Sequence, residues 1–329
     1  MRHRPVFFVA AFVALLAQQV HAGSPYNRSA GQSAPAAAVV VDEVRKADGS
    51  VERVQREVQG PVTKDHFGNA QGSQYDLAVD GAFEGQTVAV LHLYTGEGFD
   101  FSLPKAALKE KGFSVYRWVN QPPPPAELEE KLKKASQLWI ISNSDRRLND
   151  EHVAVIKRFF DSGRGLYIWG DNEPYYADAN VVGRALLGVE MRGNIAGGHP
   201  VPLQKTTNQV GVRPNHLLST GIETVYEGIT IATIDTNQTL TPVIWGSAHN
   251  VVTSAFDKDG KRALFDGGFT RLFLGWETAG TARYVKNAAA WLTNVERFGE
   301  AVTADASKPT TTTKHTTTTS TSHPITVQK

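Results

Sequence analysis

The stretch DEHVAVIKRFFDSGRGLYIWGDNE, residues 150 to 173, predicts a helix, a turn and a buried strand in direct succession. Asn149 is a suitable N-cap, and two carboxylates follow in the first turn, where the helix dipole favours negative charge. Gly163 ends the helix, and residues 166–169 have the length and apolar character of a buried strand. Apolar side chains recur along the helix at helical spacing: Val153, Ile156 and Phe160, with Phe159 beside them.

A polar cluster follows this strand directly. Asp171, Asn172 and Glu173 lie between Gly170 and Pro174. In a parallel α/β sheet, ligands bind in the loops beyond the carboxyl ends of the strands. The sequence therefore places a candidate site in this loop, although it does not identify the ligand.

The same alternation of strands and helices fills the region before this stretch. We expect strands at residues 88–91, 113–118 and 138–141, and helices at 102–111, 126–134 and 176–187. Strands that alternate with helices of this length imply right-handed crossovers and a parallel sheet covered on both faces. The predicted fold class is α/β, with a flavodoxin-like, mostly parallel sheet.

The pattern changes after Gly188, where strand-like runs follow one another with little helix between them. These runs are residues 228–232, 242–245, 251–256 and 262–265, and an Asp-Gly turn separates the last two. We expect an antiparallel C-terminal extension of the sheet, closed by a helix over residues 279–298.

The two ends of the chain differ from the central region. Residues 1–22 have the form of a secretory signal, with a basic start, an apolar run and a small-residue cleavage pattern that ends at Ala22. We expect a secreted or periplasmic protein with no membrane span after signal removal; an uncleaved anchor is the alternative. Residues 23–80 are interpreted as a flexible extension with a possible hairpin around Asp48-Gly49, 81–298 as the α/β domain, and 299–329 as a disordered Thr-rich tail.

Composition excludes several classes of function. The formal net charge of +1 gives no electrostatic footprint for nucleic acid. The chain contains no cysteine, which excludes disulfides, thiolate metal sites and a cysteine nucleophile.

The region from Gln86 to Phe298 resembles the class I glutamine amidotransferase-like, flavodoxin-like superfamily, and especially its trehalose-utilisation-like branch, which lacks amidotransferase activity. The resemblance rests on LWIIS at 138–142 followed by GRGLYIWG at 163–170, on NHLLSTG at 215–221, and on the final strand and helix. Amidotransferases place a cysteine at the strand-to-helix turn. Here that turn carries Gly170 and Asp171, so glutaminase activity is not expected.

The loop after residue 169 allows two interpretations. Asp171, Glu173 and Asp178 are candidate calcium ligands, because calcium prefers several oxygen ligands. Asp171 and Asn172 are also well suited to cap the next helix and satisfy the turn backbone. No other metal or cofactor is expected.

The remaining candidates are assigned to the same edge of the sheet or to neighbouring loops. Two or three carboxylates at that edge suit glycoside cleavage, with Glu97 and Asp171 as acid and base, helped by His199 or His216. Candidate ligand-binding residues are Asp100, Asp145, Arg146, Asn172, Glu173, Tyr176 and Arg271. For Arg271 the favoured alternative is an ion pair that ties the last strand to the closing helix.

Three functions therefore remain open. The first is an exported domain that binds a small molecule, a carbohydrate or another exported protein without amidotransferase chemistry. The second is a carbohydrate-directed hydrolase. The third is a calcium-stabilised interaction module.

Overall fold

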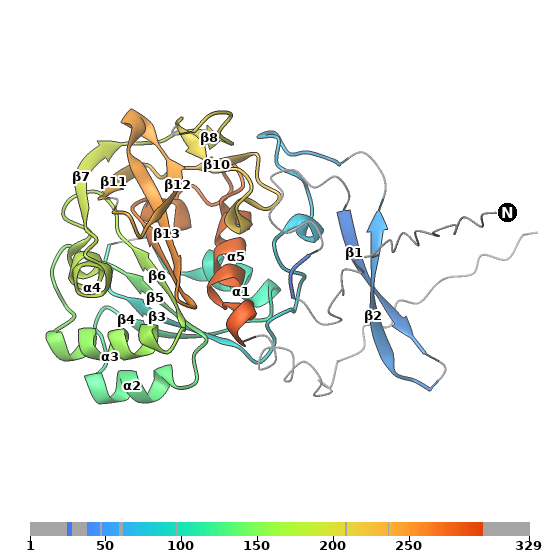
Figure 1. Ribbon diagram of the computed structural model, residues 1–329, viewed down its shortest axis with the longest axis horizontal. Coiled ribbons are helices and arrows are strands. Elements are labelled where there is room, and N and C mark those ends of the chain that lie inside the picture. Colours follow the sequence, from blue (N-terminus) through green and yellow to red (C-terminus); the bar gives the residue numbers. More distant parts are fainter. Residues whose placement is uncertain are drawn as a thin grey trace, which may run out of the picture.

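The computed structural model describes residues 25–27, 38–46, 48–58, 62–96, 98–207, 209–235 and 237–298. Its main sheet has eight strands in the order β4-β3-β5-β6-β14-β13-β12-β9 (Figure 1). The strands are β3 (Thr87–His92), β4 (Ser114–Val119), β5 (Gln137–Ile141), β6 (Gly165–Trp169), β9 (Gly211–Val212), β12 (Thr241–Trp245), β13 (Val251–Lys258) and β14 (Lys261–Asp266).

The sheet is parallel from β4 to β14 and antiparallel beyond it. β3 pairs in parallel with β4 and β5, and β6 pairs in parallel with β5 and β14. β13, β12 and β9 then add antiparallel partners. The order of the first four strands is flavodoxin-like. The predicted fold class, a mostly parallel sheet with an antiparallel extension, is confirmed.

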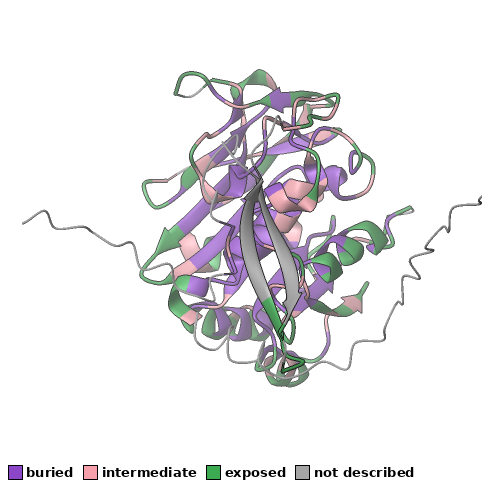
Figure 2. Ribbon diagram, turned by 90° about the vertical axis from the view of Figure 1, so that its right-hand side faces the viewer, coloured by how far each residue is buried: buried purple, intermediate pink, exposed green. Residues whose placement is uncertain are grey.

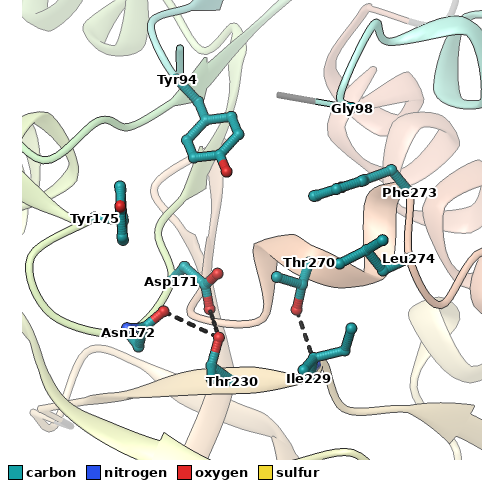
Figure 3. A pocket seen from close by; sticks show the side chains of 10 residues that line it. All are labelled: Tyr94, Gly98, Asp171, Asn172, Tyr175, Ile229, Thr230, Thr270, Phe273 and Leu274. Atoms are coloured by element: carbon teal, nitrogen blue, oxygen red, sulfur yellow. Dashed lines mark hydrogen bonds between the residues drawn. The ribbon is translucent and has the colours of Figure 1, made fainter. Parts of the chain in front are cut away.

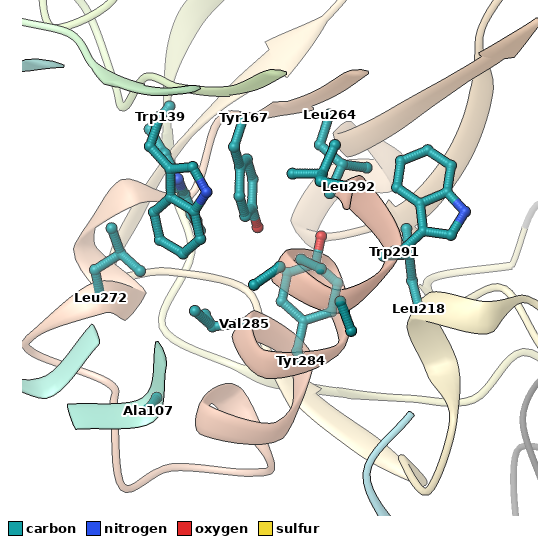
Figure 4. Close-up of a cluster of buried hydrophobic side chains, with 14 of the residues drawn as sticks. Ala107, Trp139, Tyr167, Leu218, Leu264, Leu272, Tyr284, Val285, Trp291 and Leu292 are labelled. Carbon is teal, nitrogen blue, oxygen red and sulfur yellow. The ribbon is translucent and has the colours of Figure 1, made fainter. Parts of the chain in front are cut away.

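Helices cover both faces of the sheet (Figure 1). One face carries α1 (Ser102–Glu110) and α5 (Thr281–Leu292), and the other carries α2 (Pro125–Leu132), α3 (Asp150–Asp161) and α4 (Ala177–Leu187). Each central strand therefore sends alternate side chains into two separate cores. Trp139 and Tyr167 belong to the core beside α5 (Figure 4), whereas Leu138 and Ile168 belong to the core beside α3. In Figure 2 the buried, purple ribbon is concentrated in the central strands.

The helix predicted from residue 150 onwards is α3. Asn149 caps it by accepting a hydrogen bond from the backbone N–H of His152, 3.0 Å away. The predicted apolar stripe was wrong at one position, because Val155 rather than Val153 is fully buried beside Ile156 and Phe160. In an α-helix, positions i, i+1, i+4 and i+5 lie on one side. Residues 155, 156, 159 and 160 have this spacing, so the buried face of α3 is wider than a three-residue spacing suggests.

One predicted strand of the antiparallel extension lies elsewhere. The run at residues 228–232 corresponds to β11 (Thr230–Ile234), which pairs with β7 (Met191–Ala196) in a separate two-stranded ribbon. A second ribbon joins β8 (Pro200–Pro202) to β10 (Thr224–Tyr226). Local strand signals do not specify the pairing partner, so the sequence assigned β11 to the wrong sheet.

The chain before Gly81 contains two features. β1 (Ala38–Arg45) and β2 (Val51–Val58) form an antiparallel hairpin at the place where the sequence indicated one. Farther on, Leu77 is buried, and its backbone N–H donates to the Asn287 side chain of α5 at 2.7 Å. The domain limits inferred from sequence stay predictions.

Asp76 is the centre of a buried ionic cluster that ties this segment to α1 and α5. Its carboxylate lies 2.9 Å from the ammonium of Lys111, 2.7 Å from that of Lys286 and 2.7 Å from the guanidinium of Arg283. Burial raises the pKa of Asp76, but these three cations outweigh that effect and hold the pKa below its ordinary value.

Within the described ranges, no helix has the length and apolar character needed to cross a membrane.

Candidate functional site

A pocket of about 420 Å³ opens at the carboxyl edge of the parallel strands (Figure 3). The loop after β3, the loop after β6, the start of β11 and the segment after β14 all contribute to it. Its lining residues are Tyr94, Gly98, Asp171, Asn172, Tyr175, Ile229, Thr230, Thr270, Phe273 and Leu274. The pocket is therefore where the sequence placed the candidate site, around the loop that follows residue 169.

Among the described lining residues Asp171 is the one carboxylate, and only 5% of its surface is exposed. Burial raises its pKa to about 7, although hydrogen bonds from the Asn172 backbone and the Thr230 hydroxyl partly offset the effect. The carboxyl group therefore takes up and releases a proton near neutral pH, which is the property required of a general acid or base.

Thr230 brings β11 into contact with the loop after β6. Its hydroxyl lies 3.1 Å from Asp171 Oδ1 and 3.0 Å from Asn172 Oδ1. A hydroxyl carries one hydrogen, so it donates fully to only one of these two oxygens. When Asp171 is ionised, the three side-chain oxygens thus form a group with more acceptor than donor capacity.

Aromatic rings form another part of the wall. Tyr94 and Tyr175 are in edge-to-face contact, with ring centroids 5.8 Å apart, and Tyr94 also contacts Phe269 at 4.8 Å. Figure 3 shows the Tyr94 hydroxyl on the same side of the pocket as the Asp171 carboxyl group. Burial raises the pKa of Tyr94, and the charges of Tyr175 and Asp171 add to the effect.

The backbone around the pocket offers few free donors. The N–H groups of Asp171, Tyr175, Ile229, Phe273 and Leu274 already donate to other protein groups. These five N–H groups are therefore not available to a ligand without breaking a hydrogen bond of the protein.

A buried ion pair lies behind the pocket. Arg271 and Asp266 are both 0% exposed, and their charged groups are 3.1 Å apart. Arg271 also donates to the carbonyl oxygens of Gly268 and Glu227. The prediction that Arg271 binds ligand was therefore wrong, because its buried guanidinium is bound to other groups of the protein. The structure agrees with the alternative interpretation, an ion pair inside the protein.

The other predicted residues of the β6 loop lie at or outside the rim. Asn172 lines the pocket, whereas Glu173 is exposed and Tyr176 is only partly buried, and neither belongs to the lining. Tyr175, not Tyr176, supplies the aromatic ring. The turn around Pro174 places Tyr175 rather than Tyr176 at the pocket, and the Tyr175 N–H donates to Asn172 O at 2.8 Å within this turn.

The loop after β5 does not reach the pocket. Asp145 is bound by Asn143 and Arg147, and Arg146 pairs with Asp150 on the surface. Asp178 explains this placement: its Oδ1 accepts the backbone N–H groups of residues 147 and 148, at 2.9 and 2.8 Å. These bonds fasten the loop to α4, so Asp145 and Arg146 do not join Asp171.

Asp100 and the two histidines are also outside the lining. Asp100 is exposed, and its carboxylate accepts the Ser102 N–H at the start of α1. His199 is exposed, and its backbone N–H donates to Glu227. His216 accepts the Leu218 N–H and packs against Trp291 on α5; burial first, and then Arg213, lower its pKa to about 4. Glu97 lies outside the described residues, although Gly98 beside it lines the pocket.

The predicted calcium ligands do not come together. Asp171, Glu173 and Asp178 do not form a group of ligand atoms within 4.8 Å of one another. Among the described residues such a group is formed by Asp76, Asp80 and Glu110. Two lysine ammonium groups already lie among those carboxylates, at 2.6 to 2.9 Å, so their charge is neutralised without a metal.

The sequence missed the contributions of Tyr94, Thr230, Phe273 and Leu274. Tyr94 carried a usable signal, because it lies two residues beyond β3 in a loop at the correct edge. Thr230 carried none, since its position depends on the pairing of β11 with β7. Phe273 and Leu274 follow a short 3-10 turn, Phe269–Leu272, that has no distinct sequence signature.

Fold and site together define an α/β protein of flavodoxin-like topology with a polar and aromatic pocket at the carboxyl edge of its sheet. No family model matches the chain, and no curated protein matches it by sequence. Among solved structures, a ThuA-like protein from Parabacteroides merdae is 10% identical, with a TM-score of 0.44, over 64% of this chain and 90% of its own.

Two carbohydrate-active enzymes also match in structure. An exo-β-1,4-mannosidase from an Opitutaceae bacterium is 13% identical over 64% of this chain, with a TM-score of 0.37. The carbohydrate deacetylase Agd3 is 14% identical over 63% of this chain, with a TM-score of 0.39. The matches cover 36% and 32% of those two proteins, so the chain spans about a third of their length.

Proposed function

We propose that this chain binds a small, hydroxyl-rich ligand of the carbohydrate type in the pocket around Asp171. The observation that carries the proposal is the composition of the wall. Side-chain oxygens of Asp171, Asn172 and Thr230 face the same cavity as the rings of Tyr94 and Tyr175. Sugars present hydroxyl groups to polar side chains and C–H faces to aromatic rings, and this wall offers a partner to each.

The proposal is tested by calorimetry and thermal-shift measurements with the full chain and a panel of neutral mono- and disaccharides. We expect at least one sugar to raise the melting temperature, since a ligand that binds only the folded state stabilises it. Tyr175→Ala should weaken the binding of that sugar about fivefold, because one aromatic contact is worth about 1 kcal/mol. Tyr116→Ala, at an exposed ring on β4, is the matched control. The absence of a shift with every sugar would reject the proposal.

A hydrolase acting on carbohydrates is the second candidate, and the pKa of Asp171 favours it. A carboxyl group with a pKa of about 7 is suited to protonate a leaving group near neutral pH. Glycoside cleavage requires a second carboxylate, a role for which we propose Glu97. Asp171→Asn and Glu97→Gln would be assayed on nitrophenyl glycosides, and unchanged turnover in both variants would remove the hydrolase.

The cellular setting is part of the proposal. The basic and apolar pattern of residues 1–22 supports export to a periplasm or the outside, and with it an exported ligand or partner protein. The resemblance to trehalose-utilisation-like domains is compatible with a sugar ligand.

Calcium stabilisation is the remaining alternative. A rise in melting temperature with calcium but not with magnesium would support it.

A further inference from the structure

The charged residues of the pocket wall indicate which class of ligand it binds. The described lining residues include one carboxylate, Asp171, and no Lys, Arg or His. The charge of the buried Arg271 acts on Asp171, but it is matched by Asp266 at 3.1 Å. A phosphate or carboxylate ligand would find no cation to pair with in this wall.

The hydrogen-bonding capacity of the pocket points in the same direction. Asp171 Oδ1 and Asn172 Oδ1 both approach the single hydroxyl hydrogen of Thr230. The Asn172 amide group is oriented by its Nδ2 donating to Glu173 O at 3.0 Å, which keeps the amide oxygen toward Thr230. When Asp171 is ionised, these two oxygens share one hydroxyl hydrogen, and an incoming donor supplies a second one.

The aromatic rings add a third preference. Tyr94, Tyr175 and Phe273 line the same cavity as Asp171, and aromatic faces attract cations. A cation that carries several N–H donors fits both the rings and the acceptor oxygens. Among compounds with several hydroxyl groups, that description corresponds to a protonated amine.

We propose that the ligand of this pocket carries a protonated amine beside its hydroxyl groups, as an amino sugar does. The inference rests on the proposed carbohydrate function and specifies its substrate class. The ammonium group donates to Asp171 and Asn172 beside the rings of Tyr94 and Tyr175, which also contact the remainder of the ligand. N-acetylation removes the charge, so the acetylated sugar loses the pairing with Asp171.

Calorimetry with the full chain tests the inference. Glucosamine, galactosamine and mannosamine are each compared with the parent hexose and with the N-acetyl derivative at neutral pH. A hydrogen bond between charged groups favours the amine by roughly tenfold or more. An ammonium beside Asp171 also favours its ionised form, so binding should release protons, seen as a heat that depends on the ionisation enthalpy of the buffer.

Variants separate this pairing from a general effect of negative charge. In Asp171→Asn, the ratio of amine to parent-sugar affinity should fall to about one, and the proton release should disappear. Asp145→Asn removes an exposed carboxylate outside the pocket and should keep the wild-type ratio. Circular dichroism confirms that both variants are folded.

The outcomes distinguish the inference from the function on which it rests. If a parent hexose or an N-acetyl sugar binds as tightly as the amine, the amine inference is wrong and carbohydrate binding stands. If no sugar binds, the proposed function is wrong, and serinol against glycerol then tests the amine preference by itself. Equal binding of serinol and glycerol, or binding of neither, would overturn the inference as well.

Discussion

The ionisation of Asp171 should control the pH dependence of stability at the candidate site. The unfolded carboxyl group releases its proton near 3.8, whereas burial raises the folded pKa to about 7. Between these pH values the folded state holds more protons than the unfolded state, so stability falls as pH rises. Each unit of pKa shift corresponds to about 1.4 kcal/mol, so ionised Asp171 lowers the free energy of unfolding by about 4 kcal/mol above pH 7. The effect is about half as large if water enters the open pocket.

Asp171→Asn removes this cost while keeping the shape of the side chain. Urea unfolding of wild type and variant would be measured from pH 4 to pH 8. We expect the variant to gain about 2 to 4 kcal/mol relative to wild type over that range, with most of the gain complete by pH 7.

Asp145→Asn is the control for this measurement, and its expected sign is opposite. The hydrogen bond from Arg147 lowers the pKa of Asp145, so its removal should cost a little stability as pH rises. A difference between Asp171→Asn and wild type that does not change with pH would refute the reasoning, because the carboxyl group would then titrate as it does in the unfolded chain.

Three further variants test the buried polar groups. Arg271→Met should cost about 3–5 kcal/mol in urea unfolding because it leaves Asp266 buried without its cation; the double variant with Asp266→Asn should recover part of the loss. Asp76→Asn should lower the free energy of unfolding by about 3 kcal/mol or more at neutral pH and by less in acid. The lowered pKa of Asp76 contributes stability that is lost as pH falls, so an equal cost at every pH would contradict this. His216→Ala should cost about 1 kcal/mol as a lost cap without changing sugar affinity, and a large loss of affinity would restore a role in the site.

The parts of the fold that depend on local periodicity were predictable. The run at residues 166–169 and the helix after Asn149 gave β6 and α3 at nearly their observed bounds. The helix is amphipathic with a local cap, and the strand is continuously apolar, so each signal lies within the segment itself. The pairing of β11 was not predictable, because register and partner depend on residues far away in the chain.

The site was predictable where it depends on topology alone. Asp171 and Asn172 follow a central parallel strand, and such a position faces the ligand-binding edge of any doubly wound sheet. Asp145 follows the neighbouring strand and shares that edge, yet Asp178 fastens its loop to α4. Strand order therefore identified the edge, and hydrogen bonds between distant segments selected which side chains enter the pocket.

The ionic cluster at Asp76 decides how much of the chain must be kept in any shortened version. A fragment cut at Gly81 would discard the carboxylate that Lys111 and Lys286 share, and would also remove the buried Leu77 side chain from the core beside α5. Such a fragment should express poorly even though it retains every strand of the main sheet. Shortened versions of the chain should therefore begin upstream of Asp76.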